Sequence, residues 1–346
     1  MNLRSLLTRI LRFNISQKFT GYLILVSVIP LLVVGLISYL VSRNIIQDEA
    51  RRYNVDLISE QTSYLDLLLQ EVDNLISNIS SVEEITNAMD VQSADTYTNL
   101  ATQARIGYIL NNYSNIKGLA SIDIFTTKGA HYHVGETLNA QNVRTNVRDL
   151  LLTETEPKSP AVVWIGIEDN VNADSTYTKV ITATKVFSQL DPNTMVSTPV
   201  ALLVVSYRVD YLYDHFSHLD LGNSGYLMII DGHNRIIYNP TAALIGATVG
   251  ADYMKQFTGT NGTLVMKVNG QDTSVTYKRS TISNWVVASF IPVEALTSQT
   301  NIIGVTTFLI RGFDPLEDAI DYGRELIPLV RAEAARREAQ GATRAG

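Results

Sequence analysis

SGYLMIIDGHNRIIYNP, residues 224–240, consists of two apolar, β-rich runs on either side of the tetrapeptide DGHN. Asp, Gly and Asn favour tight turns, so the stretch predicts a β-hairpin. Three more β-rich runs follow along the chain, GTLVMKVNG, TSVTYKR and NWVVASFIP. Together these runs predict an antiparallel sheet with helical covering.

A similar series of runs precedes this one, from about residue 104 onward. It consists of ASIDIFTTKGAHYHV, AVVWIGI, TYTKVITATKVF and VALLVVSYRVDYL, and TKGA is the turn of its hairpin. Two such series predict two similar half-domains, each an antiparallel sheet built around a central hairpin. The predicted fold class is therefore α+β, with two antiparallel-sheet half-domains.

N-terminal to both series, the chain from Ile45 to about Met89 predicts one long helix. Apolar residues recur there at every seventh position, and a second apolar row, interrupted by Thr62, lies beside the first. This stripe fits either a partner helix, which would give a homodimer through the long helix, or the protein's own sheets. The two rows consist of Ile58, Leu65, Val72 and Ile79, and of Val55, Leu69 and Ile76.

The stretch 19–42, FTGYLILVSVIPLLVVGLISYLVS, has no charged residue. About 24 helical residues, at about 1.5 Å each, can cross a hydrocarbon core of about 30 Å. Basic residues without any acid precede the stretch, so the positive-inside rule keeps the N-terminus in the cytoplasm. The sequence therefore predicts a single-pass anchor in a bacterial plasma membrane, with everything after Arg43 exported. The basic residues are Arg4, Arg9, Arg12 and Lys18.

Composition and motifs exclude several functions. The formal net charge of −7 argues against a nucleic-acid partner, and the absence of cysteine excludes disulfides and thiolate metal sites. No nucleophile elbow, zinc-protease motif or phosphate-binding glycine loop occurs. We therefore expect no enzyme activity, no catalytic residue and no cofactor. Two histidine pairs could each ligate a metal with a third partner, but polar surface positions explain them equally well, and no metal is predicted. The pairs are His131 with His133, and His215 with His218.

The order of these segments resembles the double Cache (dCache) sensor module of bacterial transmembrane receptors, over about residues 20–298. SGYLMIIDGHNRIIYNP and WVVASFIP carry the resemblance most specifically. The resemblance implies a membrane-distal half that holds the ligand and a membrane-proximal half that relays the signal. The predicted segments are a cytoplasmic N-terminus 1–18, an anchor 19–42, a long stalk helix region 43–103, the distal half 104–221, the proximal half 222–298, a short apolar remnant of a second transmembrane helix 299–310, and a helical tail 311–346.

The resemblance also suggests where a small-molecule ligand binds. Aromatic and cationic residues of the distal half are the natural contacts, and Tyr177 and Lys179 point to one face by strand alternation. Arg208 stands where the amino-acid-binding branch of the family has an aspartate, which favours a carboxylate or another anion. Asp210, two residues on, could equally neutralise Arg208. The five predicted ligand-binding residues are Tyr132, Trp164, Tyr177, Lys179 and Arg208.

The C-terminal region departs from the receptor pattern. The apolar stretch NIIGVTTFLI lasts about ten residues, half of what a span needs, and no output domain follows. TTFLIRGFDPLEDAIDYGRELIPLVR resembles instead the C-terminus of luciferase-like, flavin-dependent monooxygenases, which suggests a foreign tail. The predicted function is small-molecule sensing, with relay through helices to a missing cytoplasmic output. A membrane-anchored enzyme with a flavin-monooxygenase remnant and an adhesion module are the alternatives.

Overall fold

The computed structural model describes residues 15–89, 96–137, 140–190, 195–219, 221–222 and 224–295. It divides the chain into two compact units, of which one consists of residues 1–51 and 296–346 and the other of residues 52–295. In the first unit, only the N-terminal part of helix α2 (Ile15–Ser81) lies among the described residues. The predicted apolar remnant 299–310 and the helical tail 311–346 lie outside them.

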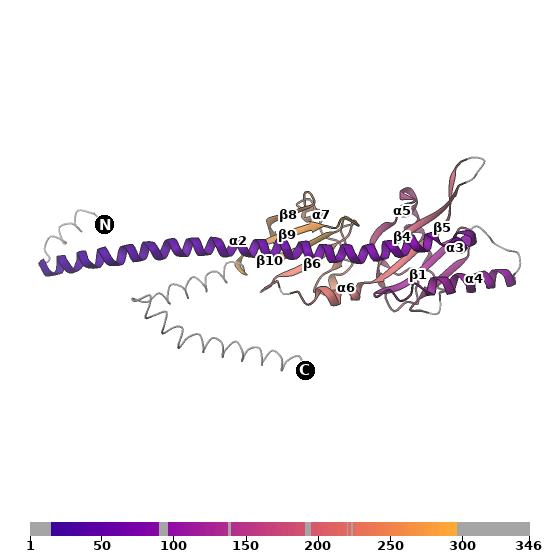
Figure 1. Cartoon of the computed structure of the whole chain (residues 1–346), viewed down its shortest axis with the longest axis horizontal. Coiled ribbons are helices and arrows are strands. Elements are labelled where there is room, and N and C mark those ends of the chain that lie inside the picture. The colour runs from indigo at the N-terminus through magenta and orange to yellow at the C-terminus, as the bar shows by residue number, and fades with distance from the viewer. Residues whose placement is uncertain are drawn as a thin grey trace, which may run out of the picture. The chain divides into compact units, whose positions relative to one another are not determined.

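The second unit contains two five-stranded sheets, and every ladder in them is antiparallel. We call residues 96–219 the first half-domain and residues 224–295 the second. The first sheet has the strand order β2-β1-β5-β4-β3, and the second has the equivalent order β7-β6-β10-β9-β8. These paired sheets confirm the predicted α+β class with two antiparallel half-domains (Figure 1).

The strands lie where the β-rich runs were predicted, and short helices connect them. In the first half-domain the elements are α4 (Thr96–Asn111), β1 (Leu119–Thr126), β2 (His131–Gly135), α5 (Thr145–Thr155), β3 (Val163–Asp169), β4 (Lys179–Leu190), β5 (Ser197–Arg208) and α6 (Val209–Phe216). In the second they are β6 (Tyr226–Ile230), β7 (Ile236–Tyr238), α7 (Ala251–Met254), β8 (Asn261–Val268), β9 (Gln271–Arg279) and β10 (Val286–Pro292).

Both predicted hairpins are present. TKGA joins β1 to β2, and Gly129 within it has a φ of 88°. DGHN joins β6 to β7, and Asn234 within it has a φ of 63°, a left-handed conformation that Asn tolerates better than most residues. Turn chemistry therefore fixes where each sheet begins.

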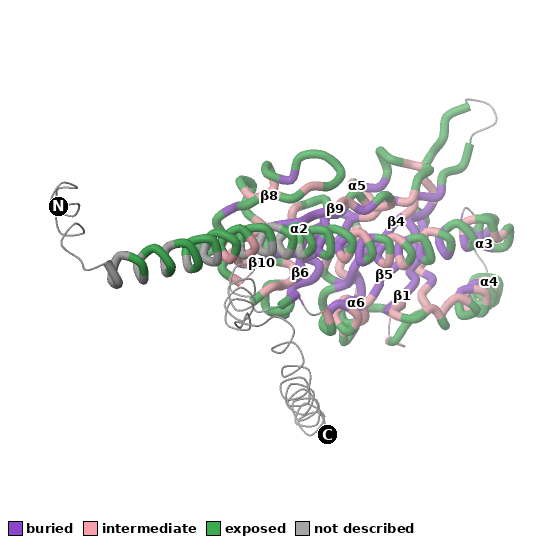
Figure 2. The backbone as a smooth tube through the Cα atoms, turned by 60° about the vertical axis from the view of Figure 1, so that its left-hand side comes forward, coloured by how far each residue is buried: buried purple, intermediate pink, exposed green. Residues whose placement is uncertain are grey.

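Helix α2 packs on the second unit's own sheets through the predicted stripe. Its first row is buried, and in the second row Thr62 is also buried and donates to the Ile58 carbonyl at 2.7 Å. Val55, in contrast, is 45% exposed. Polar contacts fix the helix further, because Lys278 Nζ lies 2.8 Å from Ser59 Oγ. Of the two readings of the stripe, the structure thus uses it for packing within one chain (Figure 2).

The long helix ends earlier than the sequence pattern suggests. Helix α2 stops at Ser81, where the Val82 N–H bonds the Ile79 carbonyl at 3.2 Å, and α3 (Glu83–Met89) begins as a separate helix. Ile85 and Met89 remain buried after this break. The spacing of apolar residues thus continues from α2 into α3, although the helix itself is interrupted.

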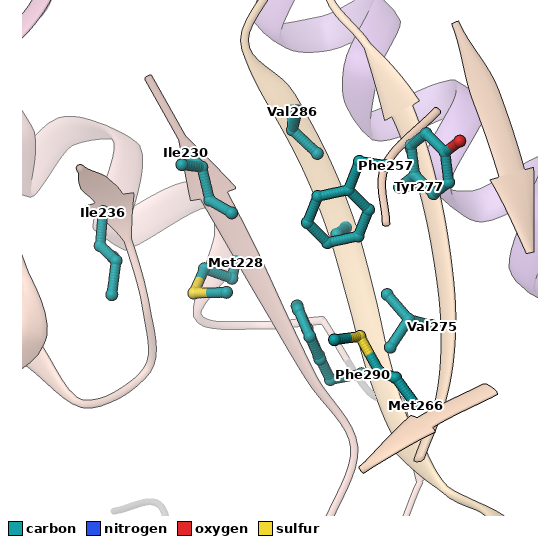
Figure 3. Packing of buried hydrophobic residues seen from close by; sticks show 10 residues of the cluster. Met228, Ile230, Ile236, Phe257, Met266, Val275, Tyr277, Val286 and Phe290 are labelled. Carbon is teal, nitrogen blue, oxygen red and sulfur yellow. The ribbon is translucent and has the colours of Figure 1, made fainter. Parts of the chain in front are cut away.

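Each sheet has its own apolar core. In the second half-domain, Met228, Ile230, Val275 and Phe290 pack with the α7 region through Phe257 (Figure 3). In the first, apolar residues of α5 pack on the sheet in one cluster. That cluster consists of Phe125, Val147, Leu151, Val163, Ile165, Val171, Val186, Leu202 and Val204.

Among the helices formed by the described residues, none combines the length and apolarity needed to cross a bilayer. The predicted anchor 19–42 falls within α2 and stays a prediction.

Candidate functional site

A cavity of about 460 Å³ lies where β4 begins and β5 ends, and we call it the Tyr177 cavity. Tyr177 and Lys179 line it, and the guanidinium carbon of Arg208 lies 4.6 Å from the centre of the Tyr177 ring. Three of the five predicted ligand-binding residues therefore meet here. The other lining residues are Thr176, Thr178, Val209, Asp210, Tyr213, Ala242 and Ile245.

Carboxylates accompany both cations at this cavity. Arg208 binds both oxygens of Asp210, with Nε 3.0 Å from Oδ1, and Lys179 Nζ lies 2.8 Å from Asp169 Oδ1. The Arg208 hydrogen bond lowers the pKa of Asp210 and raises that of Arg208 itself. Arg208 is about a third exposed, so it is not the buried, unpaired guanidinium that the anion prediction assumed. The cavity presents both signs of charge to a ligand.

Tyr132 lies elsewhere, at a second cavity of about 590 Å³ that borders strand β2, which we call the β2 cavity. Its side chain is buried, and this burial raises the pKa of the phenol. Residues of α4 and α5 complete the wall. The lining residues are Asn99, Thr102, Gln103, Gly107, Phe125, Thr126, Gly129, Ala130, His131, Tyr132, His133, Ala140, Gln141, Val143 and Arg148.

Trp164 packs between the two half-domains. Its ring meets that of Trp285 edge to face, with the ring centres 5.6 Å apart, and Trp285 is fully buried. Trp164 is not among the described residues that line the Tyr177 cavity or the β2 cavity. Its aromatic area thus stabilises the contact between the halves.

Next to the β2 cavity, Asp123 of β1 brings the first predicted histidine pair together. Its Oδ1 lies 2.9 Å from His131 Nε2 and 2.7 Å from His133 Nδ1. Among the described residues, this is the only group of three or more side chains placed to share a metal ion. The sequence carries a signal for it, since Asp123 is an acid in the apolar strand LASIDIFT, but the acid faces the hairpin's histidines only once the strand register is known.

The second predicted histidine pair does not form such a group. His215 stacks on Tyr64 of α2, with ring centres 3.5 Å apart, whereas His218 is exposed. Burial, followed by the charge of His218, lowers the pKa of His215. His215 therefore joins α6 to α2.

The DGHN hairpin binds the first half-domain through Asp231 and Arg235. Asp231 was expected to form the turn, and its Oδ1 does accept the N–H groups of His233 (2.9 Å) and Arg235 (2.8 Å). Its Oδ2 also accepts the Ile167 N–H from β3, at 3.1 Å. Arg235 donates to the Ile165 carbonyl at 3.1 Å and pairs with Glu168. We call this network the Asp231 latch, and nothing in the local turn sequence had indicated it.

Comparisons with known proteins place this geometry in context. A family model described as Cache domain, dCache_1, matches residues 42–300. A search of curated proteins gives no match.

Solved structures with the same fold are extracellular and ligand-binding domains. The ligand-binding domain of Mlp24 with asparagine is 12% identical, with a TM-score of 0.54, covering 75% of this chain and 99% of that one. The ligand-binding domain of the Pseudomonas fluorescens chemoreceptor CtaA with L-isoleucine is 13% identical, with a TM-score of 0.51, covering 74% of this chain and 98% of that one. The ligand-binding domain of the Campylobacter jejuni chemoreceptor Tlp3 with L-norvaline is 11% identical, with a TM-score of 0.52, covering 72% of this chain and 94% of that one. At such identities the likeness establishes the fold.

Proposed function

Because the chain belongs to the Cache domain family, we propose that it is the extracytoplasmic, small-molecule-sensing region of a membrane-bound signal-transduction receptor. In this proposal the first half-domain is the membrane-distal half and binds the ligand, and the second relays the signal. The protein carries no catalytic role. The amino acids bound by domains of the same fold support a small polar ligand.

The Tyr177 cavity is the ligand site in this proposal. Its volume of about 460 Å³ lies within the range of about 300–1,000 Å³ that is typical of ligand pockets. Tyr177 and Lys179 line it, and the Arg208 guanidinium lies over the Tyr177 ring; this meeting of an aromatic ring with two cations is the observation that carries the proposal.

The charges at the cavity favour a ligand with at least one carboxylate. Arg208 can bind a carboxylate bidentately, either alongside Asp210 or in its place. Because Asp210 and Asp169 stand beside the cations, a ligand that also carries an ammonium group fits as well as a simple anion does.

Helix α6 provides a short route from the cavity to α2. Val209, Asp210 and Tyr213 of α6 line the cavity, and His215 of the same helix stacks on Tyr64. A ligand that changes the geometry of the Arg208–Asp210 pair would displace α6 and alter the stacking of His215 on Tyr64. Binding would then favour one of two arrangements of α2.

The membrane arrangement is part of the same proposal. Residues 19–42 would anchor the chain in the bilayer, with the N-terminus in the cytoplasm and α2 leading to a cytoplasmic output. A homodimer would form along α2. Since the heptad stripe is already buried in one chain, the dimer would use the other face of the helix, on which Leu67 is exposed.

A thermal-shift titration of the purified full-length chain in detergent tests the ligand site. The panel contains organic acids, amino acids, amines and sugars, and a ligand that binds only the folded state raises the Tm. We expect a saturable shift from a carboxylate, lost in Arg208→Ala and Tyr177→Ala. Lys179→Ala weakens it, whereas Lys255→Ala, which breaks an exposed Lys–Asp pair in the second half-domain, leaves it unchanged.

Two outcomes would contradict the proposal. A saturable hit that survives both Arg208→Ala and Tyr177→Ala places the ligand elsewhere. A folded protein that responds to nothing in the panel favours the adhesion alternative. The anchored-enzyme alternative has less support, because a flavin-binding barrel needs parallel strands, and the described residues contain only antiparallel ladders.

A further inference from the structure

The cluster of Asp123, His131 and His133 follows from the register of the first hairpin. Asp123 lies opposite His133 and Phe125 opposite His131, so all four side chains project from one face of the sheet. The His131 ring stacks on that of Phe125, with centres 4.3 Å apart. Packing therefore holds both imidazoles against a carboxylate whose side chain is 0% exposed.

The donors and acceptors of this cluster can all be satisfied only if a positive charge lies at its centre. Both His131 Nε2 and His133 Nδ1 point at Asp123 Oδ1, which accepts but cannot donate when ionised. The other ring nitrogen of His133, Nε2, lies 3.0 Å from the Thr137 carbonyl, also an acceptor. A neutral imidazole has one donor nitrogen, so His133 needs a second proton or a cation at Nδ1.

The buried Asp123 carboxylate favours a positive charge beside the His133 ring. A divalent ion would take the proton's place with more charge. Its ligand atoms are already close, because all three lie within 4.8 Å of one another. Bonds of about 2.0–2.1 Å at a tetrahedral ion would separate neighbouring ligand atoms by about 3.3 Å, a modest expansion of the 2.9 and 2.7 Å between Asp123 Oδ1 and the two histidine nitrogens.

The surroundings of the cluster are those of a metal site. Ligating histidines usually donate their other N–H to a carbonyl, as His133 does to Thr137. Ser121 Oγ donates to Asp123 Oδ2 at 2.7 Å, which orients the carboxylate so that Oδ1 faces the two histidine nitrogens. The β2 cavity borders both histidines and leaves space for an exchangeable fourth ligand.

We propose that Asp123, His131 and His133 bind a divalent first-row transition metal of the zinc class, at a site separate from the Tyr177 cavity. Two imidazole nitrogens and one carboxylate oxygen suit such an ion, and they suit Ca²⁺ or Mg²⁺ less well. The inference goes beyond the proposed function, because it adds a metal to a receptor region for which a carboxylate ligand is proposed. It makes the first half-domain responsive to metal availability.

Equilibrium dialysis of the full-length chain against Zn²⁺ tests the proposal, using protein purified without a polyhistidine tag and stripped with EDTA. We expect about one Zn²⁺ per chain, and Co²⁺ to give the intense visible absorption of a tetrahedral site. His131→Ala, whose side chain is 20% exposed, should weaken Zn²⁺ binding about 100-fold or more. His218→Ala, which changes an exposed histidine, should bind as the parent does.

Asp123→Asn provides a second variant, since it keeps the side-chain shape and removes the charge. It should weaken Zn²⁺ binding as well, while far-UV circular dichroism confirms the fold of each variant. Unchanged stoichiometry and affinity in His131→Ala and Asp123→Asn would overturn the proposal, as would a folded parent chain that takes up no Zn²⁺. A carboxylate thermal shift in the metal-free protein is a separate readout, so failure of either proposal is distinguishable from failure of the other.

Discussion

The backbone N–H of Ile167 in β3 donates to the Asp231 carboxylate in the second half-domain's hairpin, across 3.1 Å and 64 residues of chain. A single buried carboxylate therefore terminates a local turn and joins two half-domains. The same residue pairs with Arg235, whose guanidinium also reaches the Ile165 carbonyl and Glu168. In the proposed relay, this contact couples the two half-domains.

Removing the latch carboxylate should destabilise the protein strongly. Asp231→Ala removes one of the two carboxylates that pair with Arg235 and leaves the Ile167 N–H unsatisfied, a loss of about 3–5 kcal/mol in the free energy of unfolding. Urea denaturation measures it. Asp272→Ala, at an exposed position, should stay within about 0.5 kcal/mol of the parent. A similar effect for both variants would argue against the latch.

Gly166 should tolerate no side chain. Its φ of 103° already disfavours other residues, and a Cβ there would collide with the Asp231 carboxylate. We expect Gly166→Ala to cost at least about 3 kcal/mol, from strain and overpacking together.

Gly129→Ala is the matched control for this substitution. Gly129 has a similar φ of 88°, but a Cβ there meets no atom within 4 Å. Gly129→Ala should lower the free energy of unfolding by only about 1 kcal/mol, because only the left-handed backbone conformation opposes a side chain there. Equal costs for the two variants, measured by the same urea denaturation, would mean that the close approach at Gly166 is unimportant.

Stability should rise with pH through the titration of His215. Its folded-state pKa is lowered by burial and then by His218, so near and below about pH 6.5 the unfolded chain binds more protons than the folded one. The stabilisation is complete above about pH 7.5 and is lost as the pH falls through 6.5. His215→Phe keeps the ring on Tyr64 and should reduce this dependence. Unfolding midpoints from pH 5 to 8 for the parent and the variant measure the difference, and identical slopes would contradict it.

The predicted topology can be tested with single cysteines, because the chain has none of its own. In intact cells of a bacterial host, Ser188→Cys, at an exposed position of β4, should react with a membrane-impermeant maleimide. Ser5→Cys, N-terminal to the predicted anchor, should react only after lysis. Labelling of Ser5→Cys in intact cells, or protection of Ser188→Cys, would contradict an anchor with a cytoplasmic N-terminus.

Local sequence signals predicted the fold better than they predicted the site. Turn residues at TKGA and DGHN placed both hairpins, since turn chemistry depends on a few adjacent residues. The heptad stripe identified the buried face of α2 but included the exposed Val55. Periodicity shows which face is apolar and does not show where the sheets that cover it begin.

The candidate site depends on contacts between distant segments, and those were mostly missed. Strand alternation put Tyr177 and Lys179 together, and the sequence left open the Arg208–Asp210 pair that the structure contains. Nothing in the sequence showed that Trp164 would pack on Trp285. Asp123 was overlooked because an acid in an apolar strand has meaning only once its neighbour strand is known. Strand register and the packing of the two half-domains decide which of these residues meet, and neither can be predicted from one segment of sequence.

The strand order has a consequence for how the chain is made. In each sheet the strand that is synthesised last lies in the middle, between strands that precede it in the chain. This strand is β5 in the first sheet and β10 in the second. Neither sheet can close until that strand has left the ribosome, so early strands wait with open edges. The first sheet is complete at Arg208, well before β10 begins at Val286. A nascent chain can therefore finish the first half-domain while the second is still unmade, and long-range pairings of this kind make the final closure the slow step of folding.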